Sequence, residues 1–204
     1  MLPRSDTGLR GPIAMVVACV GLGALVYFNY QPFYETMFEA SIFRAIRADD
    51  PDAIKLALRE DPRINKESSI GETPLAYAVR TGKLNAVKYL LKRKANVDGK
   101  DGYTPMHIAG QYGRPEIARA LIAHGLDSND VWAQDGHDAL IRACNGMTPR
   151  FTEAAHVFMT NGATPGAIFE CFRETPNPAT KRVAREELFK RDGIKRDENG
   201  RGIL

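Results

Sequence analysis

Apolar positions in much of this chain recur every three or four residues, in short segments separated by glycines. One segment has apolar residues at Leu84, Val87, Leu90 and Leu91, and another at Ile117, Ala118, Leu121 and Ile122. This spacing predicts helices that each bury one face. Gly82 and Gly113 precede the two segments and predict the end of a shorter helix, because a positive φ costs little only at glycine.

These predicted helix pairs recur at a nearly fixed period. The segment Gly71–Val97 is followed by a similar one, Gly102–Asn129, which begins 31 residues later. Second helices are expected to end at Lys94, Gly125, Gly162 and Gly193, at intervals of 31, 37 and 31 residues. The longer interval predicts an insertion near 146–150. Such short helices cannot bury their apolar faces alone, so we expect the repeats to stack on one another.

Two of the repeats open with a recognisable motif. Thr73–Ala78 reads TPLAYA and Thr104–Ala109 reads TPMHIA, which are similar to the T-P-L-H-x-A signature of ankyrin repeats. Threonine can cap a helix and proline fits its first turn. The sequence departs from the family pattern at Met106, Ala76 and Ile141, and we expect no Thr-Pro opening in the third and fourth full units.

The resemblance implies an all-α fold, an ankyrin-repeat solenoid of about five helix pairs with hairpin loops. It covers roughly residues 41–204, where the last residues look like the opening of a further hairpin. The expected units are 41–70, 71–101, 102–135, 136–165 and 166–204.

The N-terminal part has a different pattern. No charged residue occurs from Gly11 to Tyr34, and residues 13–28 are apolar apart from two glycines. A helix rising 1.5 Å per residue could therefore cross the hydrocarbon layer of roughly 30 Å. We predict a short tail (1–10), a single transmembrane helix or signal anchor (11–30) and a connector (31–40) before the repeat domain.

The charges beside this segment suggest its orientation. Arg4 and Arg10 precede it, whereas the first basic residue after it is Arg44. The positive-inside rule then favours a cytoplasmic N-terminus and an extracytoplasmic repeat domain, which would be periplasmic in a bacterium. Secretion after signal cleavage is an alternative, although no clear small-residue cleavage site is present. Val16–Cys19 also loosely resembles a bacterial lipobox, which would lipidate Cys19.

Overall charge argues against nucleic acid as the partner. The chain has 28 basic and 25 acidic residues, without long runs of one sign, unlike the basic footprint of a nucleic-acid binder. Cys19, Cys144 and Cys171 lack the spacing of a metal cluster. Because packed helices are commonly 8 to 10 Å apart, beyond the usual Cα separation of a disulfide, we predict that Cys144 and Cys171 are small buried residues.

Catalytic chemistry has weak support in this sequence. His107 occupies the signature position that ties neighbouring ankyrin repeats together, and His124, His137 and His156 lack a partner at the i+4 spacing of a helical zinc site. We therefore expect no catalytic residues, metal, cofactor or small-molecule substrate. An enzyme using Cys144 or a histidine remains a lesser alternative.

The resemblance instead implies binding of a partner protein through the concave face. The family's variable positions, mapped onto this chain, predict partner contacts at Tyr77, Arg80, Tyr103, Ile108, Gln111, Tyr112, Trp132, His137 and Arg142. Tyrosine, tryptophan and arginine are the residues that binding hot spots favour. The anchored arrangement resembles bacterial inner-membrane ankyrin proteins, some of which support a stress-defence enzyme such as a catalase. An immunity or inhibitor protein that blocks a toxin or enzyme is the main alternative.

Overall fold

The computed structural model describes residues 41–99, 103–129, 137–191, 195–196 and 202–203, with side chains given up to residue 191. The chain divides into two units, Met1–Ala40 and Ser41–Leu204, and the described residues all belong to the second. The predicted tail, membrane segment and connector lie outside the described residues, as does Trp132. Within the described ranges, no helix combines the length and the apolar character that crossing a membrane requires.

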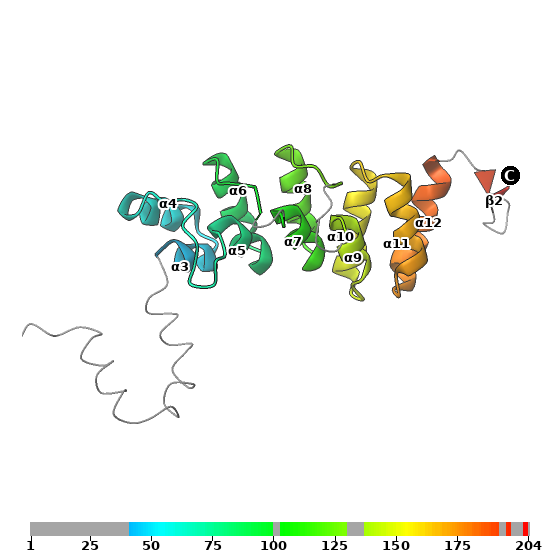
Figure 1. Cartoon of the computed structure of the whole chain (residues 1–204), viewed down its shortest axis with the longest axis horizontal. Coiled ribbons are helices and arrows are strands. Elements are labelled where there is room, and N and C mark those ends of the chain that lie inside the picture. Colours follow the sequence, from blue (N-terminus) through cyan, green and yellow to red (C-terminus); the bar gives the residue numbers. More distant parts are fainter. Residues whose placement is uncertain (1–40, 100–102, 130–136, 192–194, 197–201, 204) are drawn as a thin grey trace, which may run out of the picture. The chain divides into compact units, whose positions relative to one another are not determined.

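The second unit is built from consecutive pairs of antiparallel helices (Figure 1). The first helices of the pairs are α3 (Ser41–Ala48), α5 (Pro74–Thr81), α7 (Pro105–Gln111), α9 (Ala139–Cys144) and α11 (Pro165–Glu174). The second helices are α4 (Pro51–Glu60), α6 (Leu84–Lys92), α8 (Pro115–Ala123), α10 (Pro149–Thr160) and α12 (Pro178–Arg191). A short antiparallel hairpin follows, formed by β1 (Lys195–Arg196) and β2 (Gly202–Ile203).

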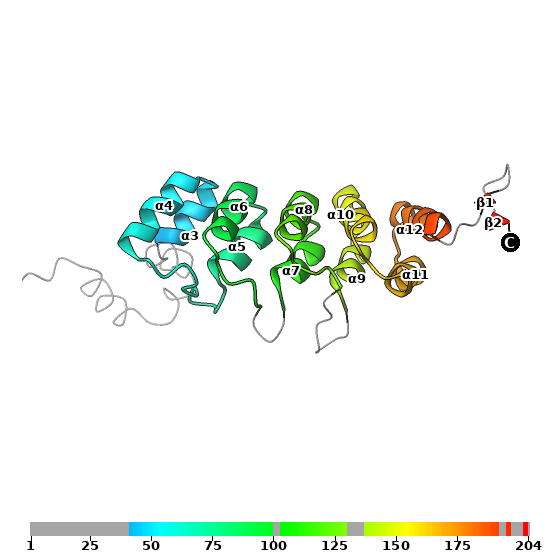
Figure 2. The ribbon, with the colours of Figure 1, turned by 90° about the horizontal axis from the view of Figure 1, so that it is seen from above.

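The helices form two layers, because each packs on its counterpart in the next pair. In the first-helix layer α3 contacts α5, α5 contacts α7, α7 contacts α9 and α9 contacts α11. The second-helix layer follows the same order from α4 to α12. Figure 2 shows the first helices along one side and the second helices along the other. The all-α repeat architecture expected from the sequence is thus confirmed.

Local sequence explains where the short helices begin and end. In α5 the Thr73 hydroxyl accepts a hydrogen bond from the backbone N–H of Ala76 at 3.2 Å, and Pro74 occupies the first turn. Gly82 ends this helix with φ of 77°, a conformation that costs a side-chain-bearing residue more than glycine. Gly113 has a φ of 56° at the corresponding turn. These features fix the sharp reversal between the two helices of a pair.

The core lies between the two layers. Phe43, Leu75, Leu90 and Phe158 are among its largest fully buried side chains. Six of the eight apolar positions expected from the helical spacing are buried: Val87, Leu90, Leu91, Ile117, Ala118 and Leu121. Leu84 and Ile122 are partly exposed because they lie nearer the edge of the buried face.

Polar side chains tie neighbouring repeats together where the layers end. Asp49 accepts hydrogen bonds from the backbone N–H of Ala86 at 2.8 Å and from the Asn85 side chain at 3.2 Å. In the hairpin loops, the Asn65 side chain accepts from the N–H of Asn96 at 2.8 Å. These bonds link groups more than thirty residues apart and set the register of the stack.

The fourth full unit does begin with Thr-Pro, contrary to the sequence-based expectation. Thr164 caps α11 by accepting a hydrogen bond from the N–H of Ala167 at 3.2 Å, and Pro165 lies in the first turn. The signature is hard to recognise because Gly166 follows where the family has a large apolar residue.

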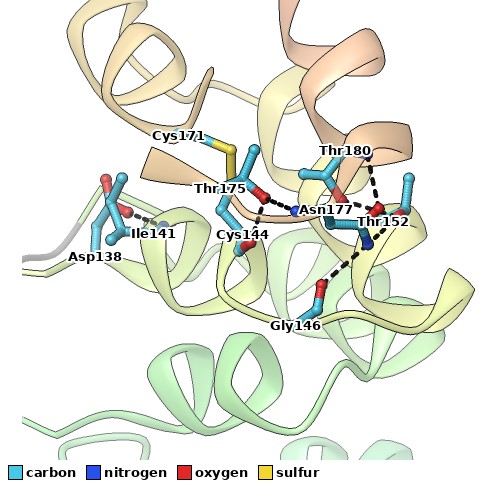
Figure 3. Close-up of a disulfide and its surroundings, with 9 residues drawn as sticks. All are labelled: Asp138, Ile141, Cys144, Gly146, Thr152, Cys171, Thr175, Asn177 and Thr180. Atoms are coloured by element: carbon cyan, nitrogen blue, oxygen red, sulfur yellow. Dashed lines mark hydrogen bonds between the residues drawn. A yellow bond between two sulfur atoms is a disulfide. The ribbon is translucent and has the colours of Figure 1, made fainter. Parts of the chain in front are cut away.

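Cys144 and Cys171 form a disulfide between α9 and α11, so the prediction of two separate buried thiols was wrong (Figure 3). Their Cα atoms are 5.7 Å apart. The prediction compared the Cα separation that a disulfide requires with the distance between the axes of packed helices. Because Cα atoms lie about 2.3 Å from each axis, facing Cα atoms of packed helices are closer by up to about 4 to 5 Å.

A buried polar network lies beside the disulfide, in the turn between α11 and α12 (Figure 3). The Thr175 hydroxyl donates to the carbonyl of Cys144 at 2.6 Å. The Asn177 side chain donates to the carbonyl of Gly146 at 3.0 Å and to the Thr152 hydroxyl at 3.1 Å, and it accepts from the N–H of Ala179 at 3.0 Å. The last helix pair is therefore fastened to the preceding pair by both covalent and polar links.

Candidate partner-binding surface

A groove of about 630 Å³ lies between two successive hairpin loops and the first helices α5 and α7. Its floor includes Ala76, Pro105 and Ile108, and the described residues of its walls are Asn65, Glu67, Ile70, Gly71, Glu72, Thr73, Asn96, Asp98, Gly99 and Tyr103. In Figure 2 the coloured parts of these loops extend from the first-helix side of the stack. Five of the nine predicted contact residues line the groove: Arg80, Tyr103, Ile108, Gln111 and Tyr112.

Arg80 is held in place at one end of the groove. Its guanidinium forms two hydrogen bonds of 2.8 Å with the Glu72 carboxylate. The hydrogen bonds that Arg80 donates to the Glu72 side chain are the main reason that the pKa of Arg80 is raised. The same guanidinium lies over the ring of Tyr77, 5.3 Å from its centroid. Its position is thus fixed by a planar paired contact, which restricts the rotamers that Arg80 can adopt.

Tyr77 contributes chiefly to packing between the first two helix pairs. Its ring meets Phe43 edge to face at 5.4 Å between centroids, and its hydroxyl is 3.3 Å from Nε of Arg47. This residue does not line the groove. Its position bridges α3 and α5, so its truncation would disturb the stack as well as any partner contact.

Tyr103 links two repeats across the other end of the groove. Its hydroxyl is hydrogen-bonded to Gln111, and its ring stacks on His107 at 5.5 Å between centroids. The guanidinium of Arg142 lies over the same ring at 4.8 Å. Tyr103, Gln111 and Arg142 therefore form one connected group, whereas Ile108 is only 7% exposed and contributes mainly to the floor.

Two exposed apolar side chains face solvent at the groove. Tyr112 is 38% exposed and Ile70 is 73% exposed. Tyr112 was predicted from the sequence, but Ile70 was not, because it lies in the hairpin loop and outside the mapped variable positions. An isoleucine just before Gly71, in a loop that is otherwise polar apart from Pro62 and Ile64, is the signal that could have identified it.

Comparison with known proteins agrees with this architecture. A sequence model of ankyrin repeats in three copies matches residues 42–135, and the stacked helix pairs and hairpin loops extend the same pattern to the C-terminal side. Residues 42–135 belong to the ankyrin-repeat family.

The relatives of this ankyrin-repeat chain are diverse. It is 31% identical over 104 residues to the human transient receptor potential cation channel subfamily A member 1, a match covering 50% of this chain and 9% of the channel subunit. It is 44% identical over 68 residues to human protein phosphatase 1 regulatory subunit 27, covering 32% and 44% of the two chains. For the E3 ubiquitin-protein ligase KEG of Arabidopsis thaliana the identity is 27% over 141 residues, covering 61% and 8%. The chain spans less than half the length of each of these relatives.

The signature histidine of the ankyrin repeat has its expected structural setting. His107 is 1% exposed, and its Nδ1 accepts from the backbone N–H of Thr104 at 3.1 Å while lying 2.9 Å from the Thr104 hydroxyl. His137 is half-buried just before α9, outside the groove lining. Neither position brings a histidine together with a free thiol, and Cys144 is 1% exposed and disulfide-bonded. The alternative in which Cys144 is a catalytic nucleophile is therefore wrong for this oxidised state.

Asp138 caps α9 from a buried position and gives the ankyrin domain a pH-sensitive group. Its side chain accepts from the N–H of Ile141 at 2.9 Å. Burial is the main cause that raises the pKa of Asp138, and hydrogen bonds from the backbone of Ile141 and Leu140 partly oppose it. Because the folded-state pKa exceeds the unfolded value, this group stabilises the fold most at acidic pH, and its contribution declines as pH rises through the folded pKa.

Asp138→Asn should remove this decline, because asparagine keeps an acceptor for the helix cap and does not ionise. We expect the variant's free energy of unfolding to improve relative to wild type between about pH 4 and pH 7. Urea unfolding of the variant and of wild type at about pH 4 and about pH 7 measures this difference. Asp138→Ala is the control, since it should lose about 1 kcal/mol through loss of the cap. A difference between Asn variant and wild type that is the same at both pH values would contradict the prediction.

Proposed function

We propose that this chain is a membrane-tethered ankyrin-repeat protein that binds a partner protein through the groove side of its first-helix layer, outside the cytoplasm. Ankyrin repeats support protein binding as the general role. The groove with its exposed Ile70 and Tyr112 is the observation that carries the binding site. A partner that covers exposed apolar and aromatic side chains beside a groove removes them from water, and such contacts dominate binding energy.

The disulfide supports the extracytoplasmic part of the proposal. Disulfides persist mainly in oxidising compartments such as the periplasm and the cell exterior, and thiols in the cytosol are kept reduced. The geometry of Cys144 and Cys171 permits the bond without backbone movement, since 5.7 Å lies within the usual Cα range. This agrees with the orientation favoured by Arg4 and Arg10. Support of a neighbouring stress-defence enzyme is part of the proposal by analogy with anchored bacterial ankyrin proteins.

Partner capture tests the binding surface. Ile70→Ala combined with Tyr112→Ala should weaken capture at least about tenfold, because each truncated hot-spot contact typically costs more than about 1 kcal/mol. The measurement is affinity capture from detergent-solubilised membranes, with bound proteins quantified by mass spectrometry. The matched control is Leu56→Ala, which removes a 57% exposed apolar side chain from α4 in the other layer. Equal capture by the groove variant and the control would contradict the assignment of the groove as the binding surface.

Loss of the captured partner's activity on binding would instead favour an inhibitor.

Topology is tested by reporters fused after Leu204. An alkaline phosphatase fusion, which is active only where disulfides form, should show activity, and a green fluorescent protein fusion exported through the same route should not fluoresce. Membrane fractions should retain the fusion, because an uncleaved span of about 20 residues anchors a protein stably. A fluorescent green fluorescent protein fusion together with an inactive phosphatase fusion would place the repeat domain in the cytoplasm. An active phosphatase fusion found in the soluble fraction would indicate secretion.

A further inference from the structure

The charges along the groove are unequally paired. Glu67 and Asp98 occupy equivalent places in successive hairpin loops. Glu67 lies two residues after Asn65, Asp98 lies two residues after Asn96, and these two asparagines are hydrogen-bonded to each other. Both carboxylates belong to exposed residues, and neither forms an ion pair with another residue of the described ranges. In contrast, Arg80 is compensated by Glu72. Among the described residues, the groove lining therefore presents two carboxylates, Glu67 and Asp98, that form no ion pair.

The size of the groove limits what kind of segment can enter it. A helix with its side chains is about 10 to 12 Å across. An extended chain is narrower, with a spacing of about 4.8 Å to its neighbours in a sheet. The volume of about 630 Å³ is in the range of ligand pockets. We therefore expect an extended peptide segment, and not a whole helix, to enter the groove.

We propose that this groove binds an extended segment of the partner protein that carries a lysine or arginine side chain next to an aliphatic one. The basic group lies between Glu67 and Asp98, and the aliphatic side chain packs against Ile70 and Tyr112. This inference rests on the proposed binding role and specifies its chemistry. An acidic segment would meet two like charges and would have to displace Glu72 from Arg80.

A display selection tests this chemistry directly. The probe is a library of random linear nonapeptides displayed on phage and selected on the immobilised full-length chain in its oxidised state. We expect the enriched peptides to contain Lys or Arg beside Leu, Ile, Val or Met. A synthetic peptide of the most enriched sequence should bind about tenfold more weakly to Glu67→Gln/Asp98→Asn than to wild type. Its affinity should also fall as salt rises from about 0.05 M to about 0.5 M.

The matched control is Glu60→Gln/Glu186→Gln, which neutralises two exposed carboxylates of the second-helix layer and should leave peptide affinity unchanged. Enrichment of acidic peptides, no enrichment at all, or equal affinity for the groove variant and the control overturns the inference. If Ile70→Ala/Tyr112→Ala abolishes partner capture while Glu67→Gln/Asp98→Asn leaves it intact, the binding role stands and the proposed chemistry fails. If both variants leave capture intact, the proposed binding surface fails as well.

Discussion

Reduction of the Cys144–Cys171 disulfide is expected to lower the free energy of unfolding by about 3 kcal/mol. The bond joins residues 27 positions apart, so it removes conformations from the unfolded chain. It also links α11 to α9, at the end of the described helix stack. The last helix pair contacts its neighbours through α9 and α10. Without the bond, this pair should unfold before the rest of the stack.

Urea unfolding with and without dithiothreitol measures the effect on the wild-type chain. Cys144→Ala/Cys171→Ala should show the reduced stability in both conditions. Cys19→Ala is the control for general thiol effects and should retain the full response to reductant. Because repeat stacks can unfold in steps, hydrogen exchange should locate the loss in α11 and α12. A wild-type chain whose unfolding does not respond to reductant would contradict the disulfide's proposed contribution.

Asn177→Ala is expected to cost about 2 to 3 kcal/mol. Asn177 is 4% exposed, and its side chain both caps α12 and donates to groups of the preceding pair. The alanine variant loses the cap, worth about 1 kcal/mol. It also leaves the partly buried carbonyl of Gly146 without this donor, at about 1 to 2 kcal/mol, the lower part of the usual range.

Asn177→Ser separates the two contributions. Serine provides an oxygen for the helix cap but has no side-chain amide to reach Gly146 and Thr152. Its loss of stability should therefore be roughly half that of alanine, about 1 to 2 kcal/mol. Thermal and urea unfolding of the two variants, compared with wild type, provide the measurement. Equal losses for serine and alanine would mean that the cap contributes nothing, and a neutral alanine variant would contradict the role of the whole network.

Much of the candidate surface could be predicted because ankyrin positions repeat with a fixed meaning. Arg80, Tyr103, Gln111 and Tyr112 do line one groove. The repeat pattern could not show that Arg80 is neutralised by Glu72, nor that Tyr77 is engaged with Phe43 and Arg47. Those contacts depend on side-chain directions across neighbouring repeats. Whether Trp132 contributes stays a prediction.

The sequence by itself determined the helix pairs, their order and most of the buried face. Glycine at positions 82 and 113, threonine caps and the three-and-four spacing of apolar residues are local signals, and local geometry translates them directly into structure. The tertiary structure alone decided that Cys144 meets Cys171, that Asn177 joins two helix pairs and that Ile70 stands exposed at a groove. Each of these depends on distances between segments about thirty residues apart, which are set by how the repeats stack.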